Sequence, residues 1–167
     1  MKESLPKKLR KIKLLILDVD GVLTHNGVYV GSDGNEFKKF NIQDGFGIYL
    51  LQKAGVKVAL LSGRYSKATE YRAQELKIQH VYNGYTDKLK AYEKLKEKLS
   101  LQDREIAFVG DDLPDIPVLK SVGVPIAVAN AQPEVKKVAD YVTKTSGGEG
   151  ALREIINLIL QAKKFKY

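Results

Sequence analysis

The first residues in the sequence that could form a reactive site are two aspartates separated by one residue. Asp18 and Asp20 directly follow the apolar run 14–17. Because side chains alternate along a strand, both carboxylates point to the same side. Two carboxylates this close repel each other unless a cation or a shared proton relieves the repulsion. The pair therefore indicates a chemical site or, if it stands alone, an aspartate cap in a turn.

A serine and a lysine farther along the chain are candidates for binding an anionic group. Ser62 and Gly63 follow the apolar run 56–61 and precede a segment of helical period. A hydroxyl and neighbouring amides at the start of a helix suit a phosphoryl group, although a serine there also serves as a plain N-cap. Lys88 stands at the start of the next expected helix, where a single lysine is usually a solvated charge.

A cluster of three carboxylates follows a later apolar run. Asp111, Asp112 and Asp115 come directly after the run 106–109. Three carboxylates in one turn are costly without a cation, and a set of hard oxygen ligands suits Mg²⁺. Helix capping and turn contacts are the competing interpretation of this cluster.

The elements that must position these residues follow an alternating pattern. Near-continuous apolar runs, typical of parallel strands covered on both faces, occupy residues 14–17, 56–61, 106–109 and 124–128. Segments of helical period lie near residues 44–54, 65–76, 89–99, 114–121, 132–138 and 150–163. The alternation predicts an α/β fold with a doubly wound, mainly parallel sheet. Such sheets bind ligands beyond the carboxyl ends of their strands, so all the candidate residues are expected at one edge.

One segment breaks the alternation. Residues 25–40 read as a β-hairpin insertion after the first strand, with Asp33 and Gly34 at its turn. The hairpin is expected to project near the catalytic end of that strand. No linker or repeat interrupts the chain, so residues 1–167 are expected to form one domain.

The composition limits the classes of function. The sequence contains no cysteine, which excludes disulfides and thiolate metal sites. The formal net charge is +8, and much of the excess lies in the segments 7–11 and 163–166. No nucleic-acid recognition motif accompanies this charge, so we interpret both segments as solvated, partly frayed ends. No apolar run is long enough for a membrane span or a signal peptide, so we expect a cytoplasmic protein with neither nucleic acid nor membrane as a partner.

Taken in order, these segments resemble the four sequence motifs of the haloacid dehalogenase superfamily of phosphotransferases. The resemblance implies that Asp18 attacks phosphorus and becomes a phospho-aspartate, while Asp20 acts as general acid and then general base. It also implies that Mg²⁺ is held by Asp18, the backbone carbonyl of Asp20 and Asp111. The second aspartate separates this pattern from the dehalogenases, which have no phosphoryl leaving group to protonate.

The same resemblance assigns supporting roles. Ser62, Gly63 and Lys88 would hold the remaining phosphoryl oxygens, with Lys88 also offsetting carboxylate charge. Asp112 and Asp115 would support the metal site indirectly or through water.

A narrower resemblance covers nearly the whole chain. The matching stretches are 18–24, 40–48, 62–64, 87–89, 110–113 and 147–154. They are similar to the capless phosphatases that act on 3-deoxy-D-manno-octulosonate 8-phosphate, a precursor of lipopolysaccharide. That family's substrate contacts fall on Asn41, Ile42, Gln43, Asp44, Gly45, Tyr49, Arg64 and Arg72. An arginine fork suits the carboxylate of a sugar acid, although surface salt bridging is the plainer interpretation of both arginines.

The family is homotetrameric, with associated hairpins and neighbouring subunits that help to cover each site. The resemblance therefore implies a homo-oligomer of this chain. Two alternatives remain: a phosphatase for a nine-carbon sialic-type acid 9-phosphate, which shares the motifs, and a non-catalytic oligomerisation module. A phosphatase for nucleic-acid ends has only the charge and the capless architecture in its favour.

Overall fold

Six parallel strands form the central sheet of the protein. The computed structural model describes residues 3–166. The strands are β1 (Leu14–Leu17), β4 (Lys57–Ser62), β5 (His80–Asn83), β6 (Ile106–Gly110), β7 (Val124–Ala127) and β8 (Tyr141–Val142). Their order is β5-β4-β1-β6-β7-β8, and all neighbouring pairs are parallel. The doubly wound α/β class expected from the sequence is confirmed, with β1 in the middle of the sheet.

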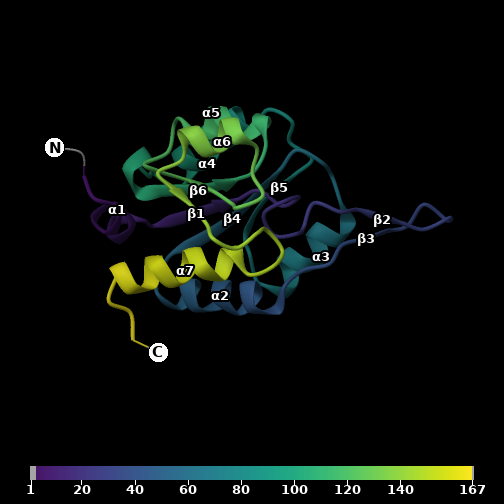
Figure 1. Ribbon diagram of the computed structural model, residues 1–167, viewed down its shortest axis with the longest axis horizontal. Helices are drawn as coiled ribbons and strands as arrows, with labels where there is room; N and C mark the ends of the chain where they lie inside the picture. Colours follow the sequence, from purple (N-terminus) through teal and green to yellow (C-terminus); the bar gives the residue numbers. More distant parts are fainter. Residues whose placement is uncertain (1–2, 167) are drawn as a thin grey trace.

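Helices cover both faces of this sheet. They are α1 (Leu5–Lys11), α2 (Ile42–Lys53), α3 (Lys67–Glu75), α4 (Lys88–Lys98), α5 (Ile116–Leu119), α6 (Pro133–Val138) and α7 (Ala151–Ala162), with the short 3-10 helices η1 (Asp103–Glu105) and η2 (Leu113–Asp115). In Figure 1, α2, α3 and α7 lie below the sheet and α4, α5 and α6 lie above it. The chain therefore forms three layers, with the carboxyl ends of the strands free to build a site.

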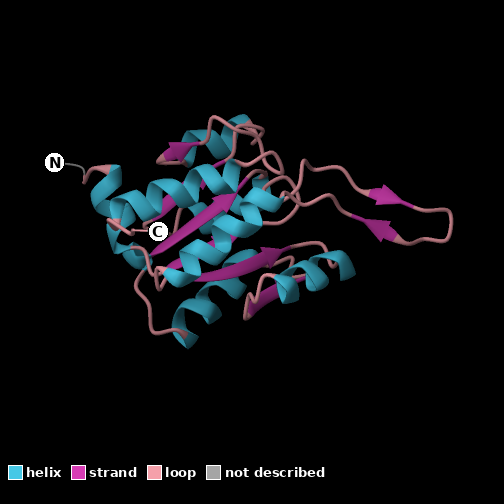
Figure 2. Ribbon diagram, turned by 90° about the horizontal axis from the view of Figure 1, so that it is seen from below, coloured by secondary structure: helices cyan, strands magenta, loops and turns pink. Residues whose placement is uncertain are grey.

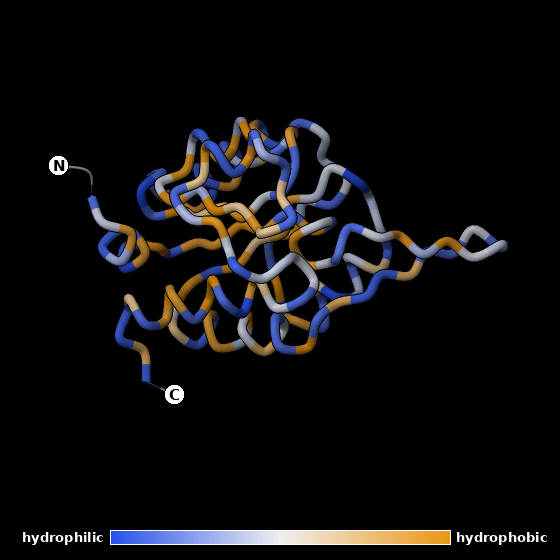
Figure 3. The backbone as a smooth tube through the Cα atoms, in the orientation of Figure 1, coloured by the Kyte–Doolittle hydropathy of each residue, from blue (hydrophilic) through white to orange (hydrophobic). Residues whose placement is uncertain are grey.

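The core follows from the apolar runs. All residues of β1 and β6 are buried, as are those of β7. Figure 3 shows the hydrophobic segments of the tube running through the middle of the molecule. Full burial of one large aliphatic side chain contributes about 1.5–3 kcal/mol, so these strands fix the sheet and hold its carboxyl edge in register.

Helix α7 begins without a side-chain cap of its own. Its N-cap residue, Gly150, has a φ of +107°, which favours glycine. The cap comes instead from α2, where Asp44 Oδ1 accepts a hydrogen bond of 2.8 Å from the amide of Arg153. Asp44 Oδ2 is buried and has no hydrogen-bond partner among the described residues. Burial raises the pKa of Asp44 to about 6, despite the opposing effect of that hydrogen bond.

The expected hairpin is present and stands clear of the sheet. β2 (Tyr29–Val30) pairs antiparallel with β3 (Glu36–Phe37), and Figure 2 shows the hairpin projecting from the body of the molecule. Gly34 has a φ of +79° in the turn. Tyr29, Val30 and Phe37 are 52%, 67% and 62% exposed, so the hairpin presents apolar side chains to solvent.

Several expectations need correction. The basic segment near the N-terminus is not frayed, because α1 buries Leu9 and the ammonium of Lys8 pairs with Asp140. At the other end, Lys163 donates a hydrogen bond to the carbonyl of Arg10. The helix expected over 114–121 is divided into η2 and α5. The strands β5 and β8 were not predicted, and within residues 3–166 no helix is long and apolar enough to cross a membrane.

Candidate active site

The carboxyl ends of three neighbouring strands bring the predicted residues together. Asp18 follows β1, Ser62 ends β4 and Asp111 follows β6. These side chains open into a cavity of about 250 Å³. The cavity is lined by Asp18, Asp20, Asn26, Ser62, Gly63, Arg64, Lys88, Asp111, Asp112, Pro114 and Asp115. The sequence argument therefore identified nearly all of the residues that line it.

A buried lysine lies between two buried carboxylates at the base of this cavity. Lys88 is the first residue of α4, whose N-cap Asp87 accepts a hydrogen bond from the amide of Lys90. This start directs the lysine toward the sheet, where its Nζ lies 2.6 Å from Oδ1 of Asp18 and 2.6 Å from Oδ1 of Asp115. A lysine in a helix is usually a solvated surface charge, but Lys88 is only 7% exposed and is therefore not one.

The carboxylates perturb one another strongly. Burial raises the pKa of Asp18, and the charge of Asp115 adds to the effect, while Lys88 opposes it. Burial and the adjacent charge of Asp18 likewise raise the pKa of Asp111. Burial works against the charge on Lys88, but Asp18 and Asp115 outweigh it and raise the pKa of the lysine. The site therefore holds an excess of buried negative charge that a cation would relieve.

The geometry of this acidic cluster fits a divalent metal ion. Asp18, Asp111 and Asp115 each offer an oxygen within 4.8 Å of the others. Asp115 is already occupied, because its Oδ1 accepts from Lys88 and its Oδ2 accepts from the amides of Asp111 and Asp112. It thus supports the site, and the oxygens left to bind a metal ion are those of Asp111 and the Oδ2 of Asp18, whose Oδ1 accepts from Lys88. Oxygen ligands of this kind suit Mg²⁺.

A glycine makes room for one of these carboxylates. Gly21 has a φ of +89° and lies in the turn after Asp20. A Cβ atom at this position would lie 2.0 Å from Oδ2 of Asp111. The close approach therefore requires glycine, and it holds the Asp111 carboxylate against the turn that follows β1.

The remaining predicted residues at the cavity have defined contacts. Asp20 Oδ1 accepts a hydrogen bond of 2.8 Å from Lys38 Nζ. The hydroxyl of Ser62 donates a 2.9 Å hydrogen bond to the carbonyl of Arg64, and the guanidinium of Arg64 pairs with Glu36. Asp112 is exposed, and its side chain accepts from the amide of Leu113.

The predicted substrate contacts on α2 and α3 do not line this cavity. The side chain of Asn41 caps α2, and Ile42 and Tyr49 are exposed on the same helix. Gln43 is also exposed, whereas Asp44 and Gly45 are buried. Arg72 donates to Glu75 and to the carbonyl of Asn41, so it is engaged within the chain. Only Arg64, of the two predicted arginines, reaches the cavity.

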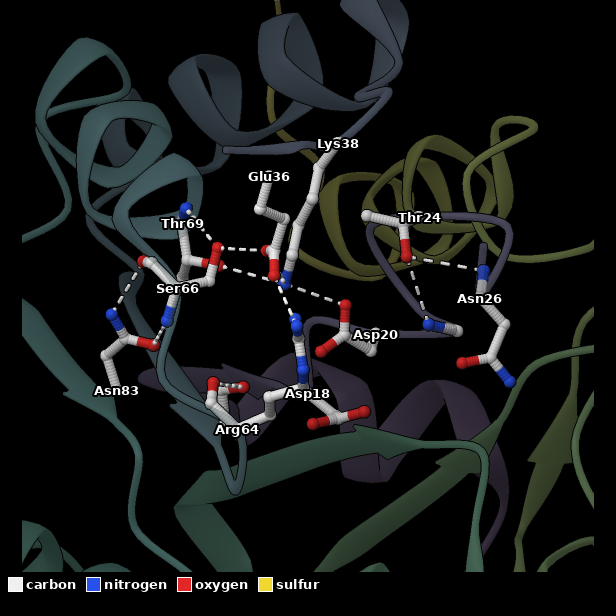
Figure 4. Close-up of polar contacts among 12 residues, drawn as sticks. Asp18, Asp20, Thr24, Asn26, Glu36, Lys38, Arg64, Ser66, Thr69 and Asn83 are labelled. Atoms are coloured by element: carbon white, nitrogen blue, oxygen red, sulfur yellow. Dashed lines mark hydrogen bonds and ion pairs between the residues drawn. The ribbon is translucent and has the colours of Figure 1, made fainter. Parts of the chain in front are cut away.

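Sequence reasoning missed a charged network at the base of the hairpin. Figure 4 shows Glu36 and Lys38 extending side by side toward Arg64 and Asp20. Lys38 has a side chain that is 0% exposed. The sequence did contain a signal for this network. Because side chains alternate along a strand, Glu36 and Lys38 share the face opposite to the exposed Phe37.

A second missed contact ties the turn after β1 to the loop that precedes α7. The side chain of Asn130 donates to the carbonyl of Gly21 and accepts from the amide of Gly147. A Cβ atom on Gly147 would lie 1.8 Å from that same carbonyl. The loop that precedes α7 is therefore packed directly on the turn after β1.

This sheet, with its paired aspartates, strand-end serine, buried lysine and second acidic turn, is that of the haloacid dehalogenase-like hydrolases. The family model with that description matches residues 79–155. The 3-deoxy-D-manno-octulosonate 8-phosphate phosphatase KdsC of Escherichia coli K12 is 46% identical over 156 residues, which are 93% of this chain and 83% of the relative.

Solved structures agree with this similarity. The 3-deoxy-D-manno-octulosonate 8-phosphate phosphatase of Yersinia pestis superposes with a TM-score of 0.94 at 44% identity, covering 96% of this chain and 86% of its own. The enzyme of Moraxella catarrhalis, solved with a magnesium ion, a phosphate ion and a KDO molecule, gives a TM-score of 0.93 at 40% identity, covering 95% and 91%. The chain belongs to the KdsC family of 3-deoxy-D-manno-octulosonate 8-phosphate phosphatases.

Proposed function

We propose that this protein is a Mg²⁺-dependent phosphatase that converts 3-deoxy-D-manno-octulosonate 8-phosphate to the free sugar acid and phosphate. The observation that carries the proposal is the buried set Asp18, Lys88 and Asp111 at the carboxyl edge of the sheet, within a cavity that opens to solvent. The KdsC relatives supply the identity of the substrate. The product belongs to the synthesis of lipopolysaccharide precursors.

The chemistry assigned to the chain has two steps. In the first, an oxygen of Asp18 forms a bond to phosphorus while the bond from phosphorus to the sugar oxygen breaks. Asp20 gives its proton to the departing sugar alkoxide. In the second step, Asp20 takes a proton from water, whose oxygen attacks phosphorus and releases phosphate from Asp18. Both aspartates return to their starting states.

The metal would be held by Asp18, Asp111 and the backbone carbonyl of Asp20. When bound, Mg²⁺ supplies positive charge that lets the phosphoryl oxygens approach the carboxylates. Lys88 stays charged between Asp18 and Asp115 and keeps the Asp18 carboxylate oriented. Ser62 and Gly63 line the same cavity and would bind phosphoryl oxygens, for which the Ser62 hydroxyl turns away from the carbonyl of Arg64.

Recognition of the sugar acid involves more than one subunit in this proposal. Arg64 would bind the carboxylate of the substrate from within the cavity. The predicted contacts that are exposed on α2, namely Ile42, Gln43 and Tyr49, would act where neighbouring copies of the chain meet. The others, Asn41, Asp44, Gly45 and Arg72, are buried or engaged within the chain and would hold that surface in place. The exposed apolar residues of the hairpin support a homo-oligomer, for which we propose a tetramer. We place the enzyme in the cytoplasm, which suits a sequence without cysteine.

The test compares phosphate release from 3-deoxy-D-manno-octulosonate 8-phosphate and from a nine-carbon sialic-type acid 9-phosphate, with and without Mg²⁺. We expect preference for the eight-carbon ester, loss of activity on chelation of the metal, and loss of activity in Asp18→Asn. Preference for the nine-carbon ester would replace the substrate and keep the mechanism. No release from either ester by the wild-type protein would overturn the proposed function.

A further inference from the structure

The hairpin is not only an appendage of the fold, because the segment that ends it enters the active site. Lys38 lies one residue beyond β3, and its side chain is completely buried. A buried ammonium is expensive unless ion pairs and hydrogen bonds compensate for the lost water. The position of Lys38 is therefore defined by its partners.

Those partners give the ammonium two hydrogen bonds and two ion pairs. Nζ of Lys38 lies 2.8 Å from Oδ1 of Asp20 and 3.4 Å from Oγ1 of Thr69, which is itself buried. Oε1 of Glu36 lies 3.7 Å away and accepts a hydrogen bond of 2.7 Å from Ser66. The ammonium is thus held from α3 and from the hairpin while it binds Asp20 (Figure 4).

This contact distinguishes the two oxygens of the Asp20 carboxyl. Oδ1 is occupied by Lys38, and Oδ2 has no hydrogen-bond partner among residues 3–166. Asp20 lines the cavity, so the free oxygen is the one available to a departing group there. A fixed orientation matters because proton transfer requires the donor atom within hydrogen-bond reach of the leaving oxygen.

We propose that Lys38 is a positioning residue for the reaction, one that holds the Asp20 carboxyl by Oδ1 so that Oδ2 faces the leaving oxygen of the phosphate ester. The inference rests on the proposed function, since it gives a role to the residue that orients its general acid. Glu36 extends the same arrangement to Arg64, so the hairpin stem contacts two residues that line the cavity, Asp20 and Arg64.

The experiment separates positioning of the acid from a general structural role by varying the leaving group. A sugar alkoxide needs a proton to depart, whereas p-nitrophenolate leaves without one. In Lys38→Met we expect kcat/KM for the octulosonate ester to fall about 100-fold, a loss that a catalytic group misplaced by about 1 Å can cause. For p-nitrophenyl phosphate we expect kcat/KM to change by less than about threefold, because general-acid help is not needed there. The comparison uses kcat/KM, which covers the reaction only as far as departure of the leaving group, whereas kcat also contains the later hydrolysis of the phospho-aspartate, in which Asp20 acts as base for either substrate.

Two controls separate the expected loss of activity in Lys38→Met from a loss of folded protein. The ratio of the two kcat/KM values is measured on one preparation, so the folded fraction cancels. Lys39→Met is the matched variant, because Lys39 is the adjacent lysine, has a side chain that is 62% exposed and pairs with the exposed Glu149 at 3.5 Å. It is expected to leave both kcat/KM values unchanged. If Lys38→Met does not fold, Lys38→Arg keeps the buried charge and shifts its donors, and the same ratio is read.

Asp20→Asn should show the same dependence on the leaving group, and adding Lys38→Met to it should lower activity no further. Equal losses on both substrates, or no loss on either, would overturn the role of Lys38. A wild-type protein that cleaves p-nitrophenyl phosphate but not the octulosonate ester would instead overturn the proposed substrate. In that case the Lys38 ratio is measured with the alkyl phosphate that the wild type does cleave.

Discussion

Gly21→Ala should weaken Mg²⁺ binding through the displacement of a neighbouring carboxylate. The new Cβ atom would lie 2.0 Å from Oδ2 and 2.5 Å from Cγ of Asp111, where ordinary contact begins at 3.4 Å. The carboxylate must therefore retreat by about 1.4 Å, the difference between these values. Mg²⁺ demands near-ideal octahedral geometry with oxygens at about 2.0–2.1 Å, so a ligand moved this far no longer binds.

The variant also carries a backbone cost, which a matched variant measures. An alanine in the left-handed region costs about 1–2 kcal/mol relative to glycine. Gly55 has a φ of +81° and no atom within 4 Å of its added Cβ, so Gly55→Ala carries the backbone cost without the clash. Gly55→Ala should lose about this much stability to urea and Gly21→Ala at least as much, while only Gly21→Ala loses metal affinity.

Calorimetric titration with Mg²⁺ alone measures the effect. We expect the Kd of Gly21→Ala to rise about 100-fold, the upper end of losses seen when the surroundings of a metal ligand are disturbed. The Kd of Gly55→Ala should match that of the wild type. Equal affinities in the two variants would refute the reasoning, because Asp111 would then not need the position that Gly21 gives it.

Two further predictions concern α2 and the hairpin. Burial raises the pKa of Asp44 to about 6 from 3.8, so the folded chain retains a proton that the unfolded chain releases, and wild-type stability falls as pH rises between these values. Asp44→Asn should therefore raise the free energy of unfolding in urea by about 3 kcal/mol at pH 8 and by little at pH 4. The same gain at both pH values would show that the raised pKa of Asp44 is not its cause. Val30→Asp with Phe37→Asp should reduce the mass seen by light scattering to that of a monomer, whereas Asn35→Asp at the hairpin tip should not; an unchanged mass would exclude the hairpin as the contact between subunits.

The strands of the sheet were predictable where burial is complete. β1, β4, β6 and β7 consist of nearly continuous apolar residues because helices cover both of their faces. β5 at the edge is only half-buried and includes His80 and Asn83, so its composition lacks that signal. β8 has two residues, too few for any period to appear.

In the candidate site, too, the residues placed by a local sequence pattern could be predicted, whereas contacts between segments far apart in the chain could not. The spacing of Asp18 and Asp20 is enough to predict that both carboxylates point to the same side, because both residues follow a single strand and side chains alternate along it. Lys88 was identified only through resemblance, since a lysine at the start of a helix is usually solvated. The contact between Lys38 and Asp20 depends on how the hairpin returns to α3, and no local pattern specifies the path of such a segment.

The position of β1 in the sheet determines when a newly made chain can first act. Asp18 is synthesised early, but β1 must pair with β6, and Asp111 follows that later strand. The turn after β1 is then bonded through Asn130 to Gly147, close to the end of the chain. Parallel pairings between such distant segments form slowly, after most of the chain is available. A growing chain on the ribosome therefore carries its nucleophile without a working site, and it becomes able to cleave phosphate esters only after the segment through Gly147 has been made.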